Sequence, residues 1–150
     1  MKGKELLKSV IGKKLESGWV QSFFLKGELV DKINVTFLKF DYWIRIVSTD
    51  EMTKLSIVEE SIDKIGHFGD EEFKYPVEPI EKHFPEFEMY YGKKLLNFKE
   101  LVLKKDEAMS FGLNLYFEDD LSYIIHNQDY PIDKNEYNFE NQIPEDLKEI

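Results

Sequence analysis

Gly12-Lys13-Lys14-Leu15 recurs 80 residues later as Gly92-Lys93-Lys94-Leu95, in a chain of 150 residues. Self-similarity at a fixed spacing indicates architecture directly, because each copy corresponds to one structural unit. The same offset also aligns apolar positions beyond the two motifs. We therefore predict that the chain contains two related units. The further matches are residues 33–37 with residues 113–117, and Trp43-Ile44 with Tyr123-Ile124.

A short helix is predicted before each motif. Apolar residues at positions 6, 7, 10 and 11 recur at the spacing of one helix face, and Gly12 suits the left-handed residue that ends a helix. Before the second motif, Pro85 suits a first helical turn, and aromatic residues at 84, 87 and 91 supply the apolar face. The motif is interpreted as a helix stop followed by a strand. It lacks the flanking glycines of a phosphate-binding loop.

Alternating apolar residues after each motif predict an antiparallel meander in each unit. In the first unit the pattern predicts strands over residues 19–26, 33–37, 42–47 and 55–58. In the second unit it predicts strands over residues 113–117 and 121–126. Tight turns are expected at Phe40-Asp41 and at Glu118-Asp119-Asp120.

These patterns predict an α+β, strand-dominated fold in which two helix-plus-meander units form one compact domain over residues 1–150. Unit 1 covers about residues 3–59 and unit 2 about residues 84–139. The connector, about residues 60–83, is rich in glycine and proline, and we expect little regular structure in it beyond residues 73–75. The tail, residues 140–150, is expected to end in a short helical turn after Pro144. Whether the units share one continuous antiparallel sheet or form two sheets packed face to face is left open.

The chain carries a formal charge of −10, from 30 acidic and 20 basic residues. A field of that sign repels phosphate backbones, so we expect no direct nucleic-acid binding. No apolar run approaches the length that crosses a bilayer, and the N-terminal stretch has no secretory pattern, so we expect a cytoplasmic protein without membrane association. The chain has no cysteine, which removes disulfides and thiolate metal sites, and no cofactor is predicted.

The three histidines, His67, His83 and His126, lack the spacings of zinc sites, so no metal site is predicted. The offset of 80 places His126 at the position of Ile46, which indicates structural drift rather than a conserved ligand role. None of the serines lies in the G-x-S-x-G motif of a hydrolase nucleophile. No catalytic residue is predicted.

The second unit resembles small uncharacterised bacterial proteins in which a short helix ends in GKK and a strand follows. In them a G-x-x-x-Y-F-E-D turn and a D-Y-P-x-D segment come next, here residues 112–119 and 129–133. Small acidic proteins of this kind are similar to immunity proteins of polymorphic toxin systems. The resemblance implies a toxin-neutralising function and no catalytic residues.

Two functional hypotheses follow. The first is a non-catalytic acidic protein-binding module that covers a basic partner, for which the resemblance implies a toxin. The alternative is a small enzyme or ligand-binding protein with a cleft between the two units. A homodimer formed through the duplicated sheet is also left open. In the first hypothesis one acidic face meets the partner, and it includes Glu118, Asp119, Asp120, Asp129 and Asp133.

Overall fold

Strands dominate the computed structural model, which describes residues 1–49, 51–65, 69–128 and 131–150. The prediction of a strand-dominated fold is confirmed, but α+β overstates the helical content. The helices in these ranges have six residues or fewer, and most of the remaining chain pairs in antiparallel sheets. No helix in the described ranges is long and apolar enough to cross a membrane. The helices are α1 (Lys4–Ser9), α2 (Ile62–Ile65), α3 (Ile80–His83) and the 3-10 helix η1 (Pro85–Tyr90).

The first sheet is the meander predicted for unit 1, extended by two strands from the connector. Its strand order is β4-β3-β2-β1-β5, and β6 also pairs with β1. β5 falls within residues 73–75, where structure was expected. The connector nevertheless contains more regular structure than predicted, because it also forms α2, β6 and α3. The strands are β1 (Ser17–Leu25), β2 (Glu28–Lys39), β3 (Trp43–Ser48), β4 (Thr53–Ile57), β5 (Phe73–Lys74) and β6 (Val77–Pro79).

The second sheet is the corresponding meander of unit 2, extended by a strand from the tail. Its order is β10-β9-β8-β7-β11. The prediction of a final helical turn is wrong, because residues after Pro144 pair with β7 as a short strand. The strands are β7 (Leu95–Leu103), β8 (Asp106–Phe117), β9 (Ser122–Asn127), β10 (Asn135–Asn138) and β11 (Leu147–Glu149).

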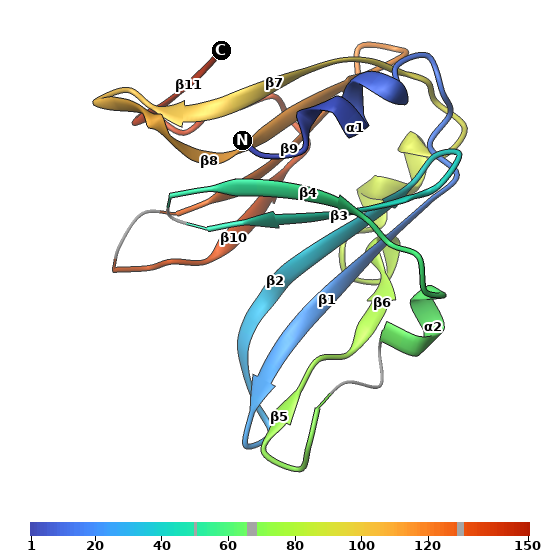
Figure 1. Cartoon of the computed structure of the whole chain (residues 1–150), viewed down its shortest axis with the longest axis vertical. Coiled ribbons are helices and arrows are strands. Elements are labelled where there is room, and N and C mark those ends of the chain that lie inside the picture. Colours follow the sequence, from blue (N-terminus) through green and yellow to red (C-terminus); the bar gives the residue numbers. More distant parts are fainter. Residues whose placement is uncertain (50, 66–68, 129–130) are drawn as a thin grey trace.

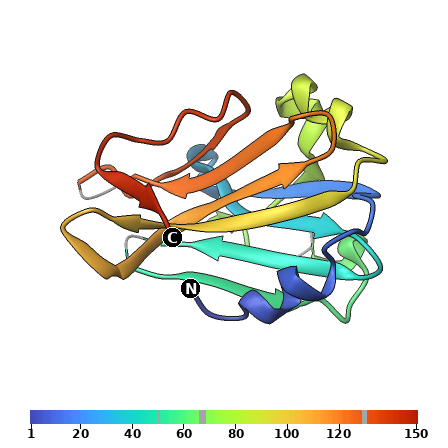
Figure 2. The ribbon, with the colours of Figure 1, turned by 90° about the horizontal axis from the view of Figure 1, so that it is seen from above.

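The two sheets pack face to face around one hydrophobic core, which decides between the two arrangements left open by the sequence (Figures 1 and 2). Seen from above in Figure 2, the sheets form two layers, with α1 beside β4. Helix α2 lies against the opposite, outer face of the first sheet, where Ile62 packs on Val35 and Phe37. The shared core includes Val20, Leu38, Ile44 and Ile46 from the first sheet, Leu113, Leu115, Phe117, Tyr123 and Ile125 from the second, and Leu7, Val10, Phe87 and Tyr90 from the helices.

The two Gly-Lys-Lys-Leu motifs pair with each other, antiparallel, where the chain enters each sheet. The Gly12 N–H donates to the carbonyl oxygen of Leu95 at 2.7 Å, and the Gly92 N–H donates to that of Leu15 at 2.8 Å. The two bonds are equivalent: each joins the glycine N–H of one motif to the leucine carbonyl of the other. This is the pattern expected for a local two-fold axis. A second reciprocal pair follows: the Leu15 N–H donates to Lys93 O at 2.9 Å, and the Leu95 N–H to Lys13 O at 3.0 Å.

The ungapped offset of 80 does not extend from the motifs into the strands. In the first sheet Leu38 pairs with Ile44, and in the second Leu115 pairs with Tyr123; both pairs face the shared core. Leu38 thus corresponds to Leu115 (115 − 38 = 77) and Ile44 to Tyr123 (123 − 44 = 79). The predicted one-to-one match of residues 33–37 with residues 113–117 is therefore wrong. Since side chains alternate between faces, an odd slip moves each residue to the other face of its sheet.

Gly12 and Gly92 have φ values of 82° and 79°, and a side chain added at either would meet open space. Alanine at each position should therefore cost only the left-handed strain, about 1 to 2 kcal/mol, and equally at both. Gly112→Ala should cost more, because its Cβ would lie 2.1 Å from the carbonyl oxygen of Ile125. Chemical denaturation measures all three. Unequal losses of unfolding free energy at Gly12 and Gly92 would contradict the equivalent helix-stop role of the two glycines. A loss at Gly112 as small as theirs would contradict the steric cost expected there.

Candidate functional site

The acidic residues predicted to form one binding face lie at two ends of the second sheet. Glu118, Asp119 and Asp120 form the turn between β8 and β9, whereas Asp133 follows β9 at its far end. The six residues of β9 separate the two groups by about 20 Å. Asp129 lies outside the described residues. The structure therefore does not bring the described acids, Glu118, Asp119, Asp120 and Asp133, together in one patch.

The turn acids contact the second Gly-Lys-Lys-Leu motif. The Glu118 carboxylate accepts a hydrogen bond from the Lys94 backbone N–H at 2.9 Å, and Asp119 pairs with the Lys93 ammonium. Asp119 and Asp120 adopt left-handed backbone angles, with φ of 61° and 57°. Aspartate is one of the few non-glycine residues that tolerate this conformation. The backbone conformation and the contacts with the motif therefore account for Glu118, Asp119 and Asp120 at this turn.

The histidines occupy unlike environments. His67 lies outside the described residues. His83 pairs with Glu78, whose carboxyl pKa is lowered chiefly by a hydrogen bond from Lys82 and then by His83. His126 is buried on the outer face of the second sheet, whereas Ile46, its match at an offset of 80, faces the core. Within the described residues, no three His, Asp or Glu side chains gather as they would around a metal ion.

The β1–β2 hairpin extends beyond the rest of its sheet, away from the second sheet (Figure 1). β3 pairs with β2 only from Thr36 onward, so the first half of β2 has β1 as its strand partner. On this hairpin, Phe23 stacks against Phe73 of β5, with ring centroids 6.2 Å apart, and against Tyr75 at 5.1 Å. Together with the exposed Val30, we call Phe23, Phe73 and Tyr75 the hairpin patch. Leu29 is exposed on the opposite face of the hairpin, because it pairs with Phe24.

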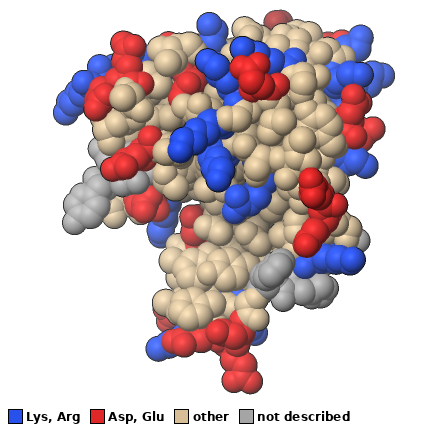
Figure 3. Space-filling model, in the orientation of Figure 1, with Lys and Arg blue, Asp and Glu red and all other residues tan. Residues whose placement is uncertain are grey.

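The hairpin patch is unusually open for large apolar side chains. Phe73 is 39% exposed and Val30 38%. In Figure 3 the lobe that carries the hairpin is mostly uncharged on the face in view, with acidic side chains gathered at its tip. An apolar centre within a charged rim is the composition of a protein-binding surface. The exposed acids around the tip are Glu28, Asp70, Glu71 and Glu72, and the cations are Lys26 and Lys74.

The corresponding hairpin of the second sheet differs in composition. The β7–β8 turn reads Lys104-Lys105-Asp106-Glu107, and Lys148 of β11 pairs with Glu107. The pairing of β11 with Leu101, Val102 and Leu103 also covers the edge of that hairpin. The apolar tip is therefore a property of the first unit alone.

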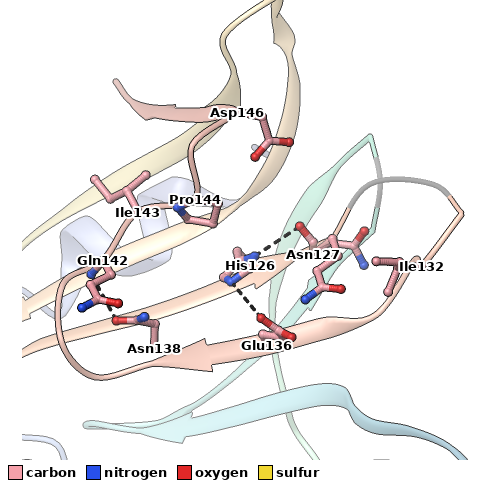
Figure 4. Close-up of a pocket in the computed structure, with 10 residues that line it drawn as sticks. His126, Asn127, Ile132, Glu136, Asn138, Gln142, Ile143, Pro144 and Asp146 are labelled. Carbon is pink, nitrogen blue, oxygen red and sulfur yellow. Dashed lines mark hydrogen bonds and ion pairs between the residues drawn. The ribbon is translucent and has the colours of Figure 1, made fainter.

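A polar pocket lies on the outer face of the second sheet, between β9 and β10 and the C-terminal segment (Figure 4). It has a volume of about 570 Å³. His126 and Glu136 come from neighbouring strands, where they are directly paired, and Asp146 comes from the C-terminal segment. Sequence reasoning missed this pocket. Its one signal was a histidine that directly follows the apolar run Tyr123-Ile124-Ile125 within a strand.

A buried hydrogen-bond network holds the C-terminal segment on the second sheet. The Asn114 side-chain amide donates to Asn141 at 2.8 Å and to Glu149 at 2.9 Å, and it accepts from the Ser122 hydroxyl at 2.7 Å. Tyr116 also donates to Glu149; burial, followed by that contact, raises its phenol pKa to about 12. The phenol therefore remains a donor across the physiological pH range.

These observations define a two-layer antiparallel β-sandwich with an apolar hairpin on one sheet and a polar pocket on the other. Comparison of the chain with protein family models, with curated proteins and with solved structures found no match. The functional argument therefore depends on the surface of this molecule itself.

Asn114→Ala should destabilise the fold by about 2 kcal/mol, because it leaves buried partners without a hydrogen bond. It should also speed amide hydrogen exchange in β11, since the C-terminal segment loses its anchor. Ser110→Ala is the matched control: the Ser110 hydroxyl is buried without a partner among the described residues, so its removal should cost little. Equal destabilisation by the two variants, or unchanged exchange in β11 of Asn114→Ala, would contradict the anchoring role.

Proposed function

We propose that this protein is a non-catalytic protein-binding module whose hairpin patch holds a basic protein partner. The observation that carries the proposal is the stacked aromatic cluster of Phe23, Phe73 and Tyr75 on a hairpin that the second sheet leaves uncovered; Phe73 is exposed and the other two rings are half-buried. Exposed aromatic side chains supply most of the binding energy in many protein interfaces, because each buries a large apolar area.

The charge of the molecule favours a basic partner. The net charge of −10 attracts a positively charged protein over a distance set by the ionic strength, and it speeds encounter. The acids at the hairpin tip then meet the basic rim of the partner while the aromatic side chains are desolvated. Charge thus accounts for the association rate, and apolar contact for the lifetime of the complex.

The second unit resembles small uncharacterised bacterial proteins that are similar to immunity proteins. This resemblance makes a toxin the specific partner that we propose, encountered in the cytoplasm. A nuclease toxin is basic where it grips phosphates, so an acidic inhibitor suits that surface. The alternative, a ligand site in a cleft between the units, has less support, because side chains of both sheets fill the space between them as a shared core.

We also propose that the two units arose by internal duplication. The reciprocal bonds between the two motifs support this, and so do the equal lengths of β1 and β7, of β2 and β8, and of β3 and β9. A further parallel is that Lys13 pairs with Asp41 at 3.1 Å, as Lys93 pairs with Asp119 in the equivalent turn. On this view the apolar hairpin of the first unit is a specialisation of one copy.

The protein, immobilised and exposed to a lysate of its native host, should capture a basic protein, and rising salt should slow the association. Phe73→Ser should weaken that capture by about tenfold or more, a loss of about 1.4 kcal/mol or more, because it removes the most exposed ring of the hairpin patch. Leu96→Ser is the matched control. Leu96 is 53% exposed on β7 of the other sheet, so this variant should bind as the unchanged protein does.

Three results would contradict the proposal: a captured protein that is acidic, capture insensitive to salt, or equal capture by the Phe73 and Leu96 variants. The toxin version has its own test. Co-expression with the product of the adjacent gene should relieve any growth arrest that this product causes, and Phe73→Ser should relieve it less.

A further inference from the structure

The polar pocket differs from the hairpin patch in chemistry and in position. It lies on the outer face of the second sheet, whereas the hairpin belongs to the first (Figures 1 and 4). The segment of residues 142–146 forms one wall, and the β9–β10 pair forms the floor. A volume of about 570 Å³ is in the range of small-ligand sites. The pocket is therefore large enough for a single side chain or a small organic molecule.

His126 supplies a buried acceptor to this pocket. Its side chain is only 8% exposed, and its Nδ1 lies 3.3 Å from the backbone carbonyl oxygen of Asn127. A carbonyl oxygen can only accept, so the ring proton belongs on Nδ1. In the neutral imidazole this leaves Nε2 as a bare acceptor. Nε2 has no hydrogen-bond partner among the described residues, and it lines the pocket.

Glu136 places a second acceptor opposite the first. Its Oε2 lies 3.7 Å from His126 Nε2, too far for a hydrogen bond between them (Figure 4). Two acceptors that face each other without a donor between them form a site for a group that can donate to both. A ligand with at least two N–H groups in a fixed orientation satisfies both atoms.

The other residues that line the pocket favour a ligand with a positive charge and a short apolar stem. The charged side chains of the lining are Glu136 and Asp146, and no lysine or arginine is among the lining residues described. Ile132, Ile143 and Pro144 supply apolar surface beside them.

We propose that this pocket binds a guanidinium group, which donates to His126 Nε2 and to the Glu136 carboxylate. A guanidinium presents five donors in a rigid plane and pairs well with carboxylates, which suits two acceptors at fixed positions. The group comes either from a free small molecule or from an arginine side chain of a protein. The inference does not depend on the function proposed for the hairpin patch, because it rests on different residues of the other sheet.

The test is a titration of the full-length protein, followed by the NMR signals of the His126 ring. The probes are agmatine, a blocked Gly-Arg-Gly tripeptide and the same tripeptide with citrulline, which keeps the shape but has no charge. We expect saturable shifts with a guanidinium probe, and affinity at least about tenfold weaker for the citrulline peptide. Tighter binding of agmatine would identify a free small molecule as the source. Tighter binding of the arginine tripeptide would identify a protein side chain.

Glu136→Gln should weaken binding of the guanidinium probe by about tenfold while the fold is retained. Glu140→Gln is the matched control, because it changes the net charge by the same amount. Glu140 is exposed just after β10 and does not line the pocket. The proposal is overturned if neither guanidinium probe gives a saturable shift at His126. It is also overturned if citrulline binds as well as arginine, or if the two glutamine variants bind alike. Capture of a basic protein through the hairpin patch is unaffected by any of these outcomes.

Discussion

Four backbone hydrogen bonds between the two Gly-Lys-Lys-Leu motifs set the arrangement of the whole molecule. Each motif ends a helix and begins a sheet, so pairing the motifs places the first strands of both sheets at one crossing point. Leu15 and Leu95 are fully buried there, between the layers. The pairing also sets Lys14 directly across from Lys94, a like-charge contact that is unfavourable in an antiparallel pair. The backbone bonds and the buried leucines evidently outweigh that repulsion. Because the two sheets start from this common crossing point, the two meanders lie face to face.

This scaffold separates the parts of the molecule that hold it together from those that are free to vary. Core positions, helix stops and the lysine–aspartate pairs at the turns are shared by the two units. The differences lie at the periphery. The first unit has an apolar hairpin with β5 packed beside it, and the second has a charged hairpin, a C-terminal strand and a pocket. Function in a scaffold of two similar units is expected where the units differ, because positions that only maintain the fold are constrained in the same way in both. The hairpin patch and the His126 pocket are the two clearest such differences.

The sequence was sufficient to predict the elements of this fold that depend on local pattern. Glycine after an apolar helix face, alternating strands and turn acids each have a mechanism that acts within a few residues. Register does not. Irregular pairing between β1 and β2 and between β7 and β8 shifts the register, so an ungapped offset assigned Val35 and Phe37 to the wrong face. Strands of three residues, such as β6 and β11, are too short to show a period and form only because a neighbouring edge is available. The pocket could not be predicted either, since one of its walls is a tail segment held by Asn114 from 27 residues away.

Native-state hydrogen exchange at the crossing tests the central claim most directly. The amide protons of Gly12, Leu15, Gly92 and Leu95 donate the four bonds, so they should open only with global unfolding and with closely similar free energies. Exchange of Leu15 and Leu95 as fast as that of Gly27, at the exposed tip of the β1–β2 hairpin, would mean that the motifs do not hold the sheets together. The account of the two units as one paired scaffold would then fail.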